Sequence, residues 1–347
     1  MSDPAPLLTV EGVTRVHGGR RFLQRTAPVV ALDNVSLSIG HGEVLGVVGE
    51  SGSGKSTLAR IAMALERPTA GRVLFEGNDL FALSSREIAP LRREFQMVFQ
   101  DPYGSLDPRH RVGRIVAEPL HLVTPRLGRR ARRERVAEVL ASVGLSPDDA
   151  SRHPHEFSGG QRQRIAIARA LATRPKLLIA DEAVSALDLS VQAQVLNLFM
   201  DLQEQQNLAI LFISHDLAVV EAIADRIAVM YRGHLVEIGP ADVVLRQPQH
   251  PYSRMLSRVA SATHVQPGVT NPSPASVARR MEIDVTADPA VPRAAPLNSS
   301  SLRGCIFQAR CPYADKLCRQ YPPILRPTST EGFAACHHAN TLSSTEQ

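Results

Sequence analysis

The sequence predicts an α/β fold in which helices cover a mostly parallel β-sheet. Three short apolar segments, Val44–Val48, Leu177–Ala180 and Ala209–Ile213, have the length and composition of buried strands. Each is followed by polar residues and then by a helical pattern, which spans Ser56–Leu65 after the first segment. Strand–helix alternation of this kind is typical of parallel sheets, because parallel neighbours need a crossover connection.

The composition is that of an ordinary globular chain with room for one large domain and a smaller one. Of the 347 residues, 44% are hydrophobic and 21% are charged, and 39 Lys and Arg against 34 Asp and Glu give a net charge of +5. No stretch approaches the roughly 18 apolar residues of a membrane span. Met1–Thr9 lacks the basic-then-apolar layout of a signal peptide. We therefore expect a cytosolic or peripheral protein that reaches a membrane only through partners.

The basic excess is concentrated in one segment. Six arginines lie within Arg126–Arg135, and Ala, Val and Leu are spaced through the residues that follow. The pattern favours a solvated helix face, and a contact with acidic lipid or a partner is the alternative. The surplus is too local to indicate nucleic-acid binding.

The chain divides into three regions. Residues 1–245 hold the strand–helix pattern, together with short strands at Leu7–Val10 and Val35–Ile39 and a mainly helical stretch over about 101–170. In residues 246–301, six prolines occur between Pro267 and Pro296, and few large apolar residues accompany them. We expect a linker or a loosely packed wrap there. Residues 302–340 form a short module with all four cysteines.

The glycine-rich turn after Val48 matches the phosphate-binding loop pattern in full, and it lies between a strand and a helix as that pattern requires. Its glycines allow successive backbone N–H groups to point at phosphate oxygens, and the helix N-terminus adds partial positive charge. Lys55 is expected to reach the β- and γ-phosphates, and the Ser56 hydroxyl to ligate magnesium. The expected nucleotide-binding residues of this loop are Gly49, Ser51, Gly52, Gly54, Lys55, Ser56 and Thr57.

The apolar segment Leu177–Ala180 ends in two carboxylates, Asp181 and Glu182. Two adjacent charges at the end of a buried strand are costly unless a cation or a substrate uses them. Asp181 is suited to magnesium coordination through water, and Glu182 to orienting and polarising an attacking water as general base.

Phe157-Ser-Gly-Gly-Gln161 precedes a helical pattern over Arg164–Ala172. Here the chain resembles the ABC ATPase family, whose signature is Leu-Ser-Gly-Gly-Gln, with Phe157 in place of the leucine. The other family motifs follow in order: Gln100 matches the Q-loop glutamine, Asp188 ends a matching D-loop, and His215 matches the switch histidine.

The resemblance implies a P-loop NTPase (RecA-like) core with an antiparallel β subdomain and a helical subdomain over about 101–170. ATP with Mg²⁺ would lie between two such domains, so that its hydrolysis releases them. The signature of one subunit would face the γ-phosphate held by the other. Glu182, His215 and Gln100 would be catalytic, and Ser56, Gln100 and Asp181 would hold magnesium. The remaining residues that would contact nucleotide are Ser158, Gly159, Gly160, Gln161 and Asp188.

One family feature has no clear counterpart. The family usually places an aromatic residue upstream of the phosphate loop, where it stacks on adenine. Alignment of Val13–His17 with that segment puts His17 at this position, and Phe22 is a rival five residues on. A third alternative is that neither ring touches nucleotide.

The C-terminal part resembles the ATPase subunits of dipeptide and oligopeptide importers. His250-Pro-Tyr-Ser resembles their His-Pro-Tyr-Thr segment, and Phe95–Pro108 resembles the Q-loop region of the second of their two ATPase subunits. This resemblance implies two transmembrane permease subunits, a second ABC ATPase (a paralogue or a second copy of this chain) and, indirectly, an extracytoplasmic solute-binding protein. The location it implies is the cytoplasmic face of the inner membrane.

The four cysteines Cys305, Cys311, Cys318 and Cys336 resemble the C-terminal cysteine cluster of those subunits, which can hold a [4Fe–4S] centre. Four thiolates are what such a centre needs, and their spacing is wider than in structural zinc knuckles. Zinc, with help from His337 or His338, and free buried thiols are the alternatives. For the whole chain, an exporter ATPase and a soluble ABC ATPase acting on nucleic acid or the ribosome are the rival functions.

Overall fold

The computed structural model describes residues 5–18, 28–101, 104–123, 127–262 and 304–341, and it has the expected α/β architecture. Its larger sheet has the strand order β11-β12-β10-β9-β3-β8-β7-β6. The five strands from β9 to β6 run parallel, whereas β10, β12 and β11 extend the sheet antiparallel. Their bounds are β3 Val44–Val48, β6 Phe95–Val98, β7 Leu177–Asp181, β8 Ala209–Ile213, β9 Arg226–Tyr231, β10 His234–Pro240, β11 Arg326–Pro327 and β12 Phe333–Ala334.

A second, antiparallel sheet has the order β2-β1-β4-β5. It consists of β1 Leu8–His17, β2 Val29–Ile39, β4 Ala70–Phe75 and β5 Asn78–Asp79. The two strands predicted near the N-terminus lie within longer ones, except that Leu7 precedes β1, and these strands pair with each other, with Leu8 opposite Ile39. This sheet is the antiparallel subdomain that the family resemblance implied.

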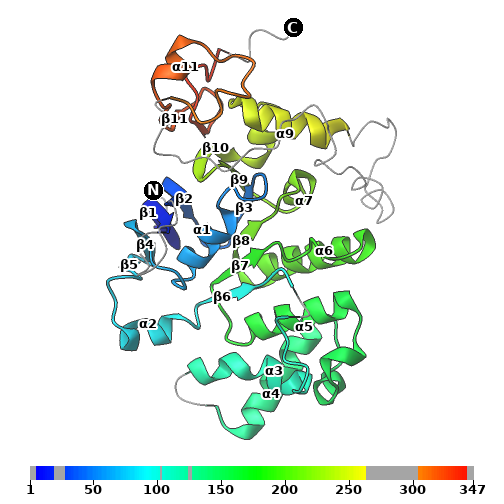
Figure 1. The fold of residues 1–347 in the computed structure, drawn as a ribbon. Coiled ribbons are helices and arrows are strands. Elements are labelled where there is room, and N and C mark those ends of the chain that lie inside the picture. The colour runs from blue at the N-terminus through cyan, green and yellow to red at the C-terminus, as the bar shows by residue number, and fades with distance from the viewer. Residues whose placement is uncertain (1–4, 19–27, 102–103, 124–126, 263–303, 342–347) are drawn as a thin grey trace.

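Figure 1 shows that α3, α4 and α5 gather at one end of the molecule, beyond β6, whereas α11 and β11 lie at the opposite end beside β10 and α9. The helical end is the expected helical subdomain. In the described part of the chain, the α-helices and the 3-10 helices (η) are α1 Lys55–Ala62, α2 Ser85–Leu91, α3 Val112–Val116, η1 Glu118–Leu122, α4 Arg129–Ser142, η2 Pro147–Ser151, η3 Pro154–Glu156, α5 Gly159–Leu171, α6 Leu189–Gln206, α7 Leu217–Glu221, α8 Ala241–Arg246, α9 Pro251–Ala262 and α11 Lys316–Gln320.

The parallel strands are buried on both faces. In β7, Leu178 and Ala180 belong to the core beneath the helical end and the C-terminal module, whereas Leu177 and Ile179 belong to the core shared with α1 and the antiparallel sheet. Successive side chains of a strand point to opposite faces. This explains why these strands read as continuous apolar runs rather than as alternating patterns.

The arginine-rich segment forms the start of α4, and Arg126 lies outside the described residues. Arg129, Arg130 and Arg133 are exposed, and Arg130 pairs with Glu134 one turn on. Arg135 instead donates to the carbonyls of Leu171 and Ala172 at the end of α5. Part of the charge therefore lies on a solvated helix face, and part of it binds the C-terminus of a neighbouring helix.

The predicted linker begins at the end of α8, but its first part is helical. Residues 251–262 form α9, in which Tyr252 is fully buried. The prolines at 267–296 lie outside the described residues. None of the described helices has both the length and the apolar character that a membrane crossing requires.

Candidate active site

The phosphate loop connects β3 to α1, and glycine is required at two of its positions. Gly54, the N-cap of α1, has a φ of 102°, and a Cβ there would lie 2.4 Å from the Ala31 carbonyl oxygen. At Gly49 a Cβ would lie 2.1 Å from the Met230 carbonyl oxygen. The loop therefore packs closely against β2 and β9, where a side chain would not fit.

Lys55 is buried beneath this loop. Its Nζ donates to the carbonyl oxygens of Gly49 at 2.6 Å and Glu50 at 3.0 Å. Burial lowers the pKa of Lys55, and the carboxylates of Glu182 and Asp181 partly offset that effect. The ammonium is thus held at the centre of the loop and faces the acidic end of β7. Ser51 and Ser56 are exposed, and Thr57 is half-buried.

Ser56 and Asp181 meet where the phosphate loop faces the end of β7. The Ser56 hydroxyl donates to the Asp181 carboxylate at 3.1 Å. Burial raises the pKa of Asp181, and neighbouring Glu182 raises it further. A hydroxyl and a carboxylate this close are the hard oxygen donors that Mg²⁺ prefers, and a bound cation would relieve the cost of the buried charge. The donor set therefore fits magnesium.

Glu182 has a left-handed backbone with a φ of 49°, which costs a residue with a side chain roughly 1–2 kcal/mol. Such strain is concentrated at functional sites. Gln100 Nε2 donates to the Glu182 carboxylate at 3.0 Å, and His215 Nδ1 lies 3.5 Å from the same oxygen. The contact with His215 lowers the pKa of Glu182 and raises that of His215. The structure thus brings together three residues that are far apart in the sequence.

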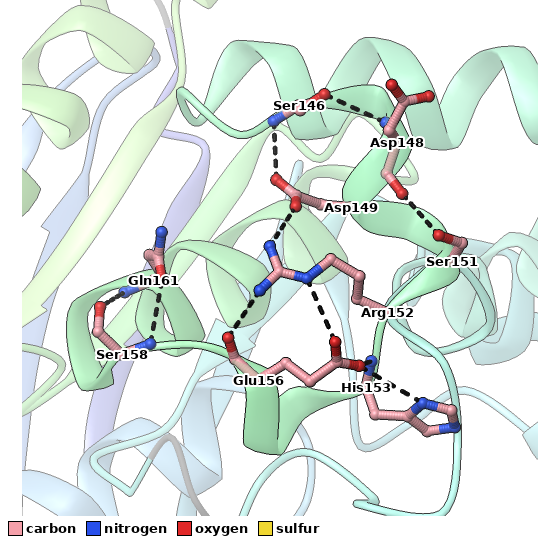
Figure 2. A network of polar contacts seen from close by, with 9 residues as sticks. All are labelled: Ser146, Asp148, Asp149, Ser151, Arg152, His153, Glu156, Ser158 and Gln161. Carbon is pink, nitrogen blue, oxygen red and sulfur yellow. Dashed lines mark hydrogen bonds and ion pairs between the residues drawn. The ribbon is translucent and has the colours of Figure 1, made fainter.

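A network of polar contacts runs through η2 and η3 just before the signature segment, and a separate pair of contacts joins Ser158 to Gln161 (Figure 2). Arg152 donates to Asp149 at 2.8 Å and to the Glu156 carbonyl oxygen at 2.8 Å, and its guanidinium lies 4.2 Å from the ring centre of buried Phe157. Ser158 then begins α5 with a reciprocal capping box that includes Gln161. Ser158 itself is exposed, so the helix N-terminus is presented to solvent in a fixed geometry.

Asp188 has the same role at the start of α6, where its carboxylate accepts from the Val191 N–H at 3.0 Å. Ser185, which the sequence did not single out as a site residue, lies 3.5 Å from Gln100 Nε2. His17 lies at the far end of β1, 3.5 Å from Glu66, with 43% of its side chain exposed. Its contact with adenine stays a prediction, and Phe22 lies outside the described residues.

The four cysteines span 32 positions of sequence, and in the C-terminal module they are near enough to influence one another electrostatically. The Cys305 N–H donates to the Cys318 carbonyl oxygen at 2.7 Å. Burial raises the pKa of Cys336 to about 11, and the neighbouring sulfur groups of Cys311, Cys305 and Cys318 contribute to the shift. All four are free thiols. His338 Nε2 lies 3.6 Å from the Cys318 sulfur and 3.5 Å from Asp315. Among the described residues, the group whose possible metal-ligand atoms all lie within 4.8 Å of one another is Asp315, Cys318 and His338.

Sequence reasoning missed a contact between the C-terminal module and the phosphate loop. Arg310 donates to both carboxylate oxygens of Glu50, at 2.9 and 3.1 Å, and the Tyr252 hydroxyl accepts from the Glu50 backbone N–H at 3.0 Å. The His-Pro-Tyr segment contains Tyr252, but its sequence gives no sign of which loop it contacts.

Taken together, the phosphate loop, the paired carboxylates and their polar neighbours define a P-loop ATPase. The chain belongs to the ABC transporter family: residues 32–185 match the family model described as ABC transporter, and residues 236–318 match that described as oligopeptide/dipeptide transporter, C-terminal region. The resemblance stated from the motifs is therefore confirmed.

Individual relatives agree with this assignment. The chain is 46% identical to the di/tripeptide transport ATP-binding protein DppF of Pseudomonas aeruginosa, over 96% of this chain and 98% of that protein. It is also 46% identical to the oligopeptide transport ATP-binding protein OppF of Salmonella typhimurium, over 89% of this chain and 88% of that protein. A solved dimeric ATP-binding cassette with bound ADP and phosphate superposes with a TM-score of 0.60 at 30% identity, covering 67% of this chain and 98% of that one.

Proposed function

We propose that this chain hydrolyses ATP to power the import of dipeptides or oligopeptides. The observation that supports this most strongly is the near full-length similarity to ATP-binding proteins named for di/tripeptide and oligopeptide transport. In this proposal the chain pairs with a second ABC ATPase and docks on two permease subunits at the cytoplasmic face of the inner membrane. An extracytoplasmic binding protein delivers the solute.

The proposed roles follow from the contacts at the end of β7. Glu182 orients and deprotonates the attacking water, and Gln100 and His215 hold its carboxylate. Lys55 and the loop N–H groups bind the phosphates, while Ser158, Gly159, Gly160 and Gln161 contact the nucleotide of the opposing subunit. Ser56, Asp181 and Gln100 are the residues that would hold Mg²⁺, which neutralises phosphate charge when bound.

The transport proposal is tested by reconstituting the chain with its permease subunits, partner ATPase and binding protein in liposomes. We expect ATP-dependent uptake of a labelled di- or tripeptide, and loss of that uptake with Glu182→Gln. ATP-driven uptake of another solute class in the same vesicles, with no peptide uptake, would contradict peptide import and leave the ATPase assignment intact.

We further propose that Cys305, Cys311, Cys318 and Cys336 ligate a [4Fe–4S] centre with a structural role. A module as short as residues 302–340 cannot bury enough apolar surface to fold by itself, so a metal centre would contribute much of its stability. His338 beside Cys318 favours zinc as the second candidate, because an imidazole together with thiolates is a usual zinc ligand set.

Anaerobic purification separates these candidates. We expect a brown protein that absorbs near 400 nm and contains about four irons per chain. Cys318→Ser should abolish the colour and lower the melting temperature, whereas His338→Gln should leave iron content unchanged. A colourless protein with one zinc that His338→Gln removes would contradict the iron–sulfur proposal.

A further inference from the structure

We propose that Arg310 is a positioning residue for ATP: it neutralises and holds the Glu50 carboxylate of the phosphate loop, and so joins the C-terminal module to nucleotide binding. The contact spans 260 positions of sequence. It is independent of which metal the cysteines hold.

The geometry places one guanidinium group against both oxygens of the Glu50 carboxylate. Arg310 Nη1 makes both contacts and also lies 3.5 Å from the Tyr231 hydroxyl. Only 12% of the Arg310 side chain is exposed, against 37% for Glu50. The guanidinium is 5.8 Å from the ring centres of both Tyr231 and Phe307, which restricts its movement. An ion pair buried to this degree is screened less by solvent than a surface pair.

A second contact holds the backbone of the same residue. The Tyr252 hydroxyl accepts from the Glu50 N–H, and Tyr252 is fixed by the start of α9. Pro251 occupies the first helical position, and His250 Nδ1 accepts from the Tyr252 N–H at 3.0 Å. The backbone N–H of His250 in turn donates to the carboxylate of buried Glu237 at 2.8 Å. The His-Pro-Tyr segment therefore positions one hydroxyl beneath the phosphate loop.

Charge explains why the side chain of Glu50 needs a partner. Glu50 is the second residue of the loop, and Lys55, the residue expected to reach the phosphates, donates to its carbonyl oxygen. A carboxylate here lies close to where a polyphosphate binds, and like charges repel across a partly desolvated site. Arg310 neutralises that charge through its contacts with both carboxylate oxygens. Without Arg310, the loop would present an uncompensated negative charge to ATP.

Arg310 is also anchored within the cysteine module. It directly precedes Cys311, and its backbone N–H donates to the Phe307 carbonyl oxygen at 3.0 Å. Phe307 packs against the rings of Tyr231, Tyr252 and His250 at centroid distances of 5.3–5.6 Å. A shift of the module would move Arg310 relative to Glu50, so nucleotide affinity and the state of the module are linked.

The test measures binding of Mg²⁺ and a non-hydrolysable ATP analogue to the full-length protein by calorimetry. We expect Arg310→Met to weaken binding about tenfold, the scale of one partly screened charge near the phosphates. Adding Glu50→Gln to that variant should restore most of the affinity, because it removes the charge that Arg310 neutralises. Arg310→Lys should retain most of the affinity. Arg319→Met, on an exposed arginine of the same module, is the matched control and should bind as the parent does.

The rescue distinguishes this proposal from a purely structural role. If Arg310→Met acted only by loosening the module, Glu50→Gln would not restore nucleotide binding. The destabilising effects of the two substitutions would then be additive in a thermal unfolding measurement. Unchanged affinity in a folded Arg310→Met protein, or a loss that Glu50→Gln leaves in place, would overturn the proposal. Neither outcome bears on peptide transport.

Discussion

The Glu182→Gln variant should bind ATP normally but hydrolyse it slower by a factor of at least about 10²–10⁴, the range for losing a general base. The glutamine keeps the size of the side chain and a hydrogen bond with Gln100, but it cannot accept the proton of the attacking water. Removal of a carboxylate beside Asp181 also lowers repulsion toward the triphosphate. Single-turnover hydrolysis and calorimetric binding together measure both effects.

A matched control is Glu204→Gln, which makes the same change on an exposed residue of α6 and should hydrolyse ATP at the parental rate. With ATP, the Glu182→Gln protein should also elute as a dimer in size-exclusion chromatography, because ATP that is not hydrolysed keeps the two domains together. Turnover close to the parental rate in Glu182→Gln would refute the role proposed for this carboxylate.

Substitutions at Lys55 and Ser158 should distinguish nucleotide binding by one chain from closure of the ATPase dimer. Lys55→Ala removes the ammonium at the centre of the phosphate loop, so we expect weak nucleotide binding by the isolated chain. Ser158→Arg instead places a bulky cation on an exposed helix N-terminus that is far along the chain from that loop. It should spare binding by the monomer but block dimer formation and hydrolysis.

Ser85→Arg, which adds an arginine to the exposed start of α2, is the control and should affect neither property. Binding to the isolated chain is measured with a fluorescent nucleotide, and dimer formation by light scattering. Equal loss of nucleotide binding in Lys55→Ala and Ser158→Arg would show that the signature acts within one chain, and would rule out a site shared between two subunits.

The parallel core could be predicted from the sequence because its strands are short, apolar and bounded by polar residues. Val44–Val48 and Ala209–Ile213 match β3 and β8 at both ends. Strands β4, β5, β6, β9, β10, β11 and β12 were not predicted. Of these, β9 and β10 form a hairpin whose register depends on tertiary pairing. The helix after the signature starts at Gly159 rather than Arg164, because the Ser158 cap supports glycines that have low helix propensity.

The sequence motifs identify the site residues but not the contacts between them. The pairing of Ser56 with Asp181 follows from strand order, which single-sequence patterns do not determine. The left-handed backbone of Glu182 has no sequence signal, since glutamate rarely adopts it. The contact of Arg310 with Glu50 could not be predicted from the sequence either, because the cysteine spacing indicates a local module and carries no information about its packing partner.

The short strand β12 has a consequence for the behaviour of the chain in solution. In its pairing with β10, Ala334 lies opposite Glu237 and Phe333 lies opposite Ile238, and β11 pairs in turn with β12. Without β12, β10 would be an exposed edge strand, and its unpaired N–H and C=O groups could pair with strands of other molecules. A chain truncated before residue 304 should therefore aggregate through the exposed edge of β10 even if its ATPase domain folds. The cysteine module thus also protects this sheet edge from self-association.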